Sequence, residues 1–150
     1  MEMQEQKPFV IGLDLGGTNA VSGIVDQRGQ VLATNSIKTG AYKTVDDFVA
    51  AGVEALKPIV AKVGGIGQIK AMGIGAPNGN FYSGSIEFAP NLSWAHDGKI
   101  PLAKMFSERL NNIPVGLTND ANAAAIGEMA YGVARGMKNF IVITLGTGVG

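Results

Sequence analysis

Residues 14–21 combine an acidic side chain with two adjacent glycines, a hydroxyl and an amide, in the order Asp-Leu-Gly-Gly-Thr-Asn-Ala-Val. Glycine has no Cβ, so a turn of this kind lets backbone N–H groups approach an anion closely. The carboxylate of Asp14, at the end of a predicted strand, can hold a hard cation directly or through water. The segment indicates a site for metal-bound nucleotide phosphates, although a plain hairpin turn with an exposed Asp fits it equally well. The candidate phosphate-binding residues are Gly16, Gly17, Thr18 and Asn19.

The spacing of these glycines excludes two common phosphate loops. A Walker A loop requires the pattern G-x-x-x-x-G-K-[ST], which no window of the chain satisfies. A dinucleotide-binding loop requires G-x-G-x-x-G at the start of a helix. Here the glycines are adjacent, and the residues that follow are rich in β-branched side chains, as in a strand. The sequence therefore predicts a clamp made of a strand, a turn and a second strand.

A second candidate site is the segment Asn119-Asp120-Ala121-Asn122, at a predicted junction between a strand and a helix. An ionised Asp120 can accept the proton of an alcohol while positioning the alcohol oxygen for attack on a phosphoryl group. Asn119 can hydrogen-bond a neighbouring hydroxyl. Asp is also a favoured residue at helix N-termini, and capping is the commoner role for an Asp in this position. Residue type alone leaves both roles open.

Four further polar or aromatic residues lie on predicted loops. Asn78 and Asn91 each follow a proline and are candidates for a pocket that binds a polyol, although turn chemistry explains Pro-Asn pairs equally well. His96 is the only histidine and is expected at the surface, because no second histidine and no cysteine is available to share a metal ion. Trp94 is expected to anchor a long loop.

The composition is that of a globular domain, with 150 residues, 46% of them hydrophobic and 16% charged. The 12 basic and 12 acidic side chains cancel and form no runs, which argues against nucleic acid or an anionic membrane as the main partner. The chain has no cysteine, so these residues form no disulfide. Neither a secretory signal nor a membrane-spanning apolar run is apparent, and we expect a soluble, cytoplasmic protein.

Hydrophobic patterns and turn signals place the candidate sites on predicted elements. Strands over 9–15, 20–26 and 30–38 are typical of an antiparallel meander. A helix capped by Thr44 should run to about Val63, with Pro58 kinking or splitting it. A hairpin is expected near 81–88. Further strands are predicted at 68–76, 114–119 and 139–145, and further helices at 101–110 and 121–131. This order predicts an α/β domain with a mixed sheet.

Four segments of the chain resemble motifs of the ROK family in their order and spacing. That family contains sugar kinases, among them bacterial glucokinases, and also sugar-responsive repressors. The segments are DLGGTNA at 14–20, FAPNL at 88–92, TNDANAAAIGE at 118–128 and ITLGTGVG at 143–150. The resemblance implies the ribonuclease-H-like (actin-like ATPase) fold, a three-strand meander followed by β-α units in a mixed sheet. It also implies that ATP binds in a cleft between two lobes, with residues 1–118 forming the N-terminal lobe and 119–150 the start of the second.

The resemblance also implies a role for each candidate residue. Asp120 would be the catalytic base, acting on the hydroxyl of the C6 carbon of a sugar. Asp14 would act on Mg²⁺ at the ATP phosphates, through water. The sugar hydroxyls would be held by Asn91, Asn119 and Asp120, the first phosphate loop would be formed by Gly16, Gly17, Thr18 and Asn19, and the second by Thr147 and Gly148.

We therefore expect an ATP-dependent hexose kinase of carbohydrate metabolism and glycolysis, most of all a glucokinase, that acts as a homodimer. These residues are expected to be a fragment of a protein about twice as long, and catalysis by residues 1–150 alone is not expected. A structural zinc motif would lie beyond residue 150. Two alternatives remain: a sugar-responsive transcriptional regulator, and a non-catalytic sugar- or nucleotide-binding module. The residues ahead of Phe9 are too few for a DNA-reading helix, which argues against the regulator.

Overall fold

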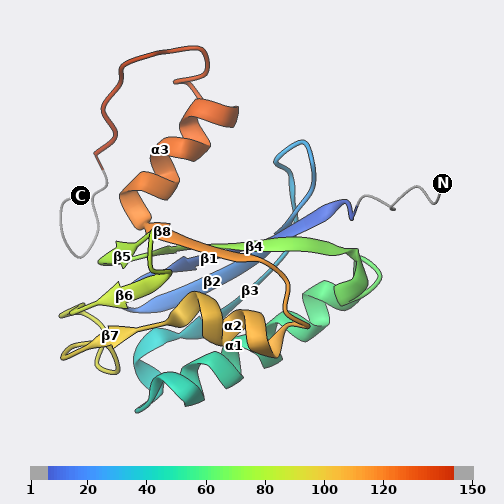
Figure 1. Cartoon of the computed structure of the whole chain (residues 1–150). Helices are drawn as coiled ribbons and strands as arrows, with labels where there is room; N and C mark the ends of the chain where they lie inside the picture. The colour runs from blue at the N-terminus through green and yellow to red at the C-terminus, as the bar shows by residue number, and fades with distance from the viewer. Residues whose placement is uncertain (1–6, 144–150) are drawn as a thin grey trace.

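The computed structural model of the chain describes residues 7–143, and its centre is a five-stranded sheet in the order β3-β2-β1-β4-β8 (Figure 1). Strands β1 (Phe9–Leu15), β2 (Asn19–Val25) and β3 (Val31–Lys38) pair antiparallel. Strands β4 (Ile69–Ala76) and β8 (Val115–Asn119) extend the sheet parallel to β1. The predicted meander and the mixed sheet are confirmed.

Two helices cover one face of this sheet, α1 (Val45–Ala61) and α2 (Leu102–Arg109) (Figure 1). The predicted cap of α1 is confirmed, because the Thr44 hydroxyl accepts a hydrogen bond from the Asp47 backbone N–H at 3.1 Å. Pro58 lies inside α1 without splitting it. The proline removes only one backbone donor, and the burial of Ile59 and Val60 holds the last turn in place.

The core lies between this face and the two helices. Every second residue of β1 points into it, so that Ile11, Leu13 and Leu15 are all buried. Phe48 of α1 is fully buried at its centre. Its ring stacks on Trp94 at 4.6 Å and lies edge-on to Phe106 and Tyr42 at 6.5 and 6.1 Å. This aromatic cluster fixes α1 and α2 against the loop that carries Trp94, whose predicted anchoring role is confirmed.

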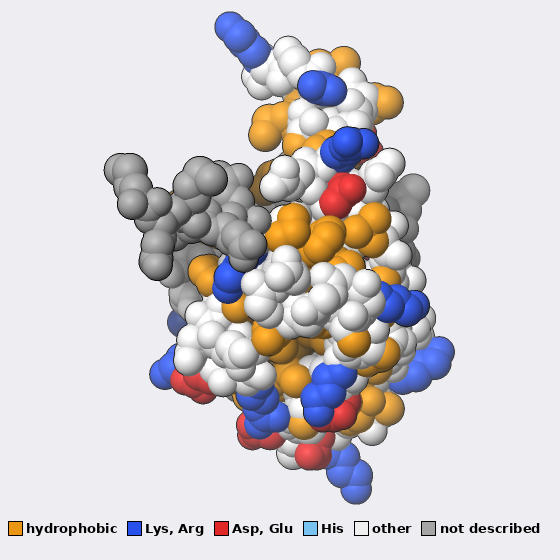
Figure 2. All heavy atoms as spheres, turned by 90° about the vertical axis from the view of Figure 1, so that its right-hand side faces the viewer, with side chains coloured by type: hydrophobic (Ala, Val, Ile, Leu, Met, Phe, Trp, Pro, Cys, Tyr) orange, Lys and Arg blue, Asp and Glu red, His pale blue; other side chains and the backbone are white. Residues whose placement is uncertain are grey.

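The opposite face of the sheet has a floor of glycines. Gly23, Gly12, Gly73 and Gly116 lie in register across β2, β1, β4 and β8. Helix α3 (Asp120–Tyr131) crosses one end of this face and buries none of its own residues. Figure 2 shows α3 and the segment after it projecting from the molecule, with hydrophobic side chains gathered where the projection meets the body. No helix within residues 7–143 is long and apolar enough to cross a membrane.

A smaller antiparallel sheet adjoins the end of the main one and contains β5 (Gly79–Asn80), β6 (Ser85–Glu87) and β7 (Lys99–Ile100). It includes the hairpin predicted near 81–88, in shorter form. Single 3₁₀ turns, η1 (Thr39–Ala41) and η2 (Ile66–Gln68), precede α1 and β4. The helices predicted at 101–110 and 121–131 and the strands at 68–76 and 114–119 are confirmed, with ends within two residues.

The strand predicted at 139–145 is wrong over residues 139–143, which form no strand. The last two of its residues lie outside the described part of the chain. No strand within residues 7–143 pairs with this segment, and an extended segment without a neighbour has no acceptors or donors for its backbone groups. The segment does have the apolar pattern of a strand, but such a pattern does not show whether a neighbouring strand is present to pair with it.

Replacing Phe48 by Ala should lower the free energy of unfolding by about 3–5 kcal/mol, because a cavity would open among three aromatic rings. Chemical denaturation of the protein measures this loss. Tyr82→Ala is the matched control, since Tyr82 is 97% exposed and its removal should cost less than about 0.5 kcal/mol. Similar losses in the two variants would show that the aromatic cluster does not hold the core together.

Candidate active site

The carboxyl ends of three parallel strands meet at one edge of the main sheet. Asp14 of β1 lies in register with Gly75 of β4, and Gly75 lies in register with Thr118 of β8. Asp14 and Thr118 are thus two strands apart, about 10 Å at the usual strand spacing. The glycine turn follows β1, and the Asn119–Asp120 junction follows Thr118. The structure therefore brings the two segments singled out in the sequence to the same edge, where open α/β sheets bind ligands.

Asp14 also borders a groove of about 660 Å³ on the glycine face of the sheet. Its carboxylate is exposed, and Thr118 and Ala123 line the groove with it. The other candidate residues in the described part of the chain do not line this groove. The candidate active site is therefore the edge of the sheet next to the groove, and the groove is a separate, largely apolar surface.

The turn after β1 is tightly closed. The Gly16 N–H donates to the Asn19 carbonyl at 2.9 Å, and a Cβ at position 16 would lie 3.0 Å from that same oxygen. A side chain at position 16 would have to displace this carbonyl by a few tenths of an ångström, so the close approach favours glycine there. Within residues 7–143, the N–H groups of Gly17 and Thr18 donate to no acceptor. The turn thus presents two neighbouring donors, together with the exposed Thr18 and Asn19 side chains, as an anion site would.

At the second segment, the structure separates the two roles that the sequence left open. Asn119 caps α3, since its Oδ1 accepts from the N–H groups of Ala121 and Asn122 at 2.9 and 3.4 Å. Asp120 is the first residue of the helix and is exposed. Its Oδ1 accepts from Ala121 N–H at 2.8 Å, and its Oδ2 has no partner among residues 7–143. The cap is therefore supplied by the neighbouring amide, and Asp120 keeps an oxygen that can accept a proton.

The two Pro-Asn pairs have different surroundings. Asn78 has a left-handed backbone, with φ of 51°, and its amide donates to the carbonyls of Glu87 and Phe88 at 3.1 and 3.0 Å. Turn chemistry accounts for Asn78. Asn91 is exposed on the loop between β6 and β7, and its side chain has no hydrogen bond within residues 7–143. Among the described residues nothing pairs with the Asn91 amide, which stays a candidate ligand contact.

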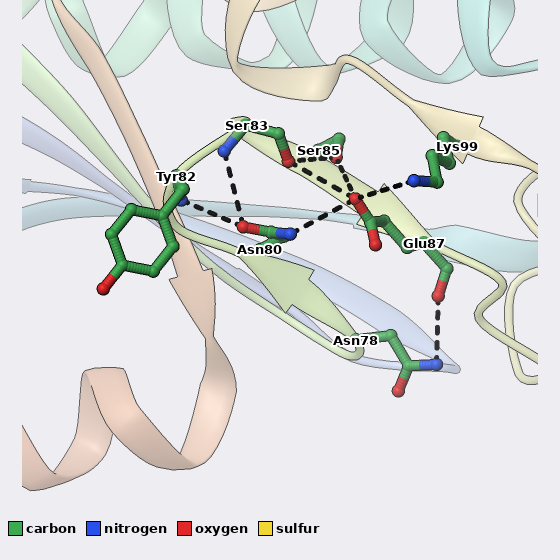
Figure 3. A network of polar contacts seen from close by, with 7 residues as sticks. All are labelled: Asn78, Asn80, Tyr82, Ser83, Ser85, Glu87 and Lys99. Carbon is green, nitrogen blue, oxygen red and sulfur yellow. Dashed lines mark hydrogen bonds and ion pairs between the residues drawn. The ribbon is translucent and has the colours of Figure 1, made fainter.

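A polar network that the sequence did not single out holds the small sheet together (Figure 3). Glu87 Oε1 accepts from Asn80, Ser85 and Ser83 at 3.3, 3.1 and 3.4 Å, and the Lys99 ammonium lies 3.8 Å away. These groups come from all three short strands and the turn between the first two. The network fixes the base of the loop that carries Asn91. The one sequence pattern that could have indicated this network is the alternation of polar side chains at Ser83, Ser85 and Glu87.

Two of the predicted phosphate-binding residues, Thr147 and Gly148, lie outside the described residues. His96 is exposed and pairs with Asp97, as expected for a surface histidine. Within residues 7–143, no cluster of three or more His, Cys, Asp or Glu side chains could hold a metal ion. Asp14 fits magnesium all the same, because Mg²⁺ is commonly bound by one or two carboxylates, several waters and the substrate phosphates.

Comparison with known proteins identifies the class. Residues 10–150 match the model of the ROK family. A glucokinase from Streptomyces coelicolor is 40% identical over 144 residues, which cover 95% of this chain and 42% of that protein. The crystal structure of a ROK family glucokinase from Streptomyces griseus, in complex with glucose and AMPPNP, superposes with a TM-score of 0.79 at 37% identity, over 95% of this chain and 43% of that one.

These neighbours confirm the ribonuclease-H-like (actin-like ATPase) fold that the motifs predicted. The chain belongs to the ROK family. It spans less than half the length of these two glucokinases. The family also contains regulators: a putative xylose repressor from Caldicellulosiruptor sp. is 27% identical over 157 residues, covering 100% of this chain and 37% of that protein.

Gly79→Ala should destabilise the protein by about 1–3 kcal/mol through overpacking. A Cβ at this position would lie 2.6 Å from the Thr118 carbonyl oxygen, so the end of β8 must move. Thermal unfolding measures the loss, and amide chemical shifts of residues 118–121 report the displacement of the Asn119–Asp120 junction. Gly98→Ala is the control, because nothing lies within 4 Å of a Cβ built there. Unchanged shifts at the junction would show that Gly79 does not position it.

Proposed function

We propose that the protein is an ATP-dependent sugar kinase that phosphorylates the C6 hydroxyl of an aldohexose, with glucose as the first candidate. The observation that carries this proposal is the arrangement at the sheet edge. An exposed carboxylate at Asp14 shares that edge with the N–H groups of Gly17 and Thr18, which have no acceptor within residues 7–143, and with Asp120, beside which Asn119 caps the helix. The similarity to glucokinases supports the choice of substrate.

Each residue then has a defined task. The Gly17 and Thr18 N–H groups, with the Thr18 and Asn19 side chains, bind phosphate oxygens of ATP, and Thr147 and Gly148 are proposed for the second phosphate loop. The side chain of Asn91 and the side-chain N–H groups of Asn119 hold sugar hydroxyls. Asp14 would hold Mg²⁺ through water, and the ion would supply positive charge that offsets the charge of the phosphates.

Asp120 acts on the reacting hydroxyl. Its free oxygen accepts the C6 hydroxyl proton as the C6 oxygen forms a bond to the γ-phosphorus atom. The bond from that phosphorus to the bridging oxygen breaks, and ADP leaves with the electron pair. The products are a sugar 6-phosphate, ADP and a proton on Asp120.

Further features belong to the same proposal. The lobe boundary lies after residue 118, and the lack of buried residues in α3 supports a second lobe that begins there. A kinase that consumes ATP in sugar metabolism and glycolysis acts in the cytoplasm. The homodimer, the absence of nucleic acid among its partners and a structural zinc in the rest of the protein are also proposed, on family resemblance alone.

A regulator on the same scaffold is the second candidate, favoured by the similarity to the putative xylose repressor. It would need the sugar-binding amides but no base at position 120. The two candidates are separated by ADP release from the whole protein with MgATP, across a panel of hexoses and N-acetylhexosamines. Turnover on one sugar would establish the kinase and its substrate. Sugar binding without turnover on any sugar would favour the regulator or a non-catalytic module.

Asp120→Asn should lower kcat by several orders of magnitude and leave sugar affinity within about tenfold, because a base acts mainly in the transition state. Steady-state kinetics and calorimetric titration with the sugar measure the two effects. Asp97→Asn is the matched control, since it removes an exposed carboxylate outside the site and should leave kcat unchanged. Near-normal turnover in Asp120→Asn would remove Asp120 from the mechanism.

A further inference from the structure

A buried threonine lies directly behind the proposed phosphate turn. Thr39 is 1% exposed and begins η1, immediately after β3. Its hydroxyl donates to the Gly16 carbonyl at 2.8 Å, and its backbone N–H donates to the Thr18 carbonyl at 3.0 Å. These two hydrogen bonds hold both ends of the turn. No pattern in the sequence distinguishes Thr39 from other threonines that follow a strand.

The position of the first hydrogen bond matters for anion binding. The Gly16 carbonyl and the Gly17 N–H belong to one peptide group. A donor on that carbonyl polarises the peptide and strengthens its N–H as a donor to an anion, because linked hydrogen bonds reinforce one another. It also limits the conformations of a turn in which two adjacent residues are glycines. Thr39 therefore fixes both the direction and the strength of the donor that the turn presents.

The same residue connects the turn to the loop that carries Asn91. The Trp94 indole N–H donates to the Thr39 carbonyl at 3.3 Å. Trp94 lies three residues after Asn91, is 8% exposed and stacks on the buried Phe48 ring. A continuous path of buried contacts thus runs from the proposed sugar loop, through Trp94 and Thr39, to the proposed phosphate turn.

We propose that Thr39 is a positioning residue for the nucleotide phosphates, and that Trp94 ties this positioning to the sugar loop. The inference rests on the proposed function, since it assigns ATP to the turn at 16–18. It adds to that function a residue that touches neither substrate: the Thr39 hydroxyl sets the geometry of the phosphate turn, and the Thr39 carbonyl holds Trp94 of the sugar loop.

The test compares Thr39→Val, which keeps the shape and removes the hydroxyl, with Thr39→Ser, which keeps the hydroxyl. In the whole protein, Thr39→Val should raise the KM for ATP about tenfold, and Thr39→Ser should stay within about twofold of the natural protein. The KM for the sugar should stay within about twofold in both. A merely structural threonine would lower stability or the active fraction and leave the KM for ATP unchanged, which would overturn the inference.

Trp94→Phe provides a second variant that keeps an aromatic ring on Phe48 and removes the indole donor. It should raise the KM for both substrates about threefold, and unchanged values would overturn the link to the sugar loop.

Calorimetric titration of each variant with MgAMPPNP separates this inference from the proposed function. If the natural protein binds the nucleotide but phosphorylates no sugar, the kinase proposal fails, and equal affinities of Thr39→Val and Thr39→Ser would then overturn the inference independently. Absence of nucleotide binding by the natural protein would overturn both.

Discussion

Parallel pairing of β1 with β4, and of β4 with β8, is the constraint on which the rest of the structure depends. It aligns Asp14, Gly75 and Thr118 in one row and so places two segments that are far apart in the chain at one sheet edge. Parallel strands need long crossover connections. Here those connections include α1 and α2. The contact between Phe48 of α1 and Phe106 of α2 closes the core. The site edge and the core are thus products of the same pairing.

The two faces of the sheet differ because successive side chains along each strand point to opposite faces. On one face, large side chains such as Ile11 and Ile74 meet the helices. On the other, four glycines in register leave a floor without side chains, and α3 approaches the sheet closely at Gly75, where a Cβ would lie 3.2 Å from the Ala123 side chain. The polar site therefore lies at the boundary between a closed hydrophobic core and an open, apolar groove.

Neighbouring polar groups in the candidate site have different hydrogen-bonding roles. Asn119 caps the helix, and the Asp120 Oδ2 has no partner within residues 7–143. Asn78 closes a turn, while the Asn91 amide on the adjoining loop makes no hydrogen bond within residues 7–143. Thr39 holds the carbonyl side of the glycine turn, and the N–H groups of Gly17 and Thr18 have no acceptor within residues 7–143. In each case one polar group satisfies the backbone so that a second can face solvent.

The sequence by itself determined what depends on near neighbours in the chain: the strands of the meander, the Thr44 cap, the glycine turn and the order of helices and strands. These follow from side-chain alternation, local hydrogen bonds and the lack of a Cβ. Family motifs named the candidate residues, but only the tertiary structure decided which of Asn119 and Asp120 caps α3, that Thr39 and Trp94 stand behind the turn, and that residues 139–143 form no strand. The physical reason is that a hydrogen bond between distant residues, such as Trp94 and Thr39, requires a contact that no local pattern encodes. A strand likewise needs a partner that its own residues cannot specify.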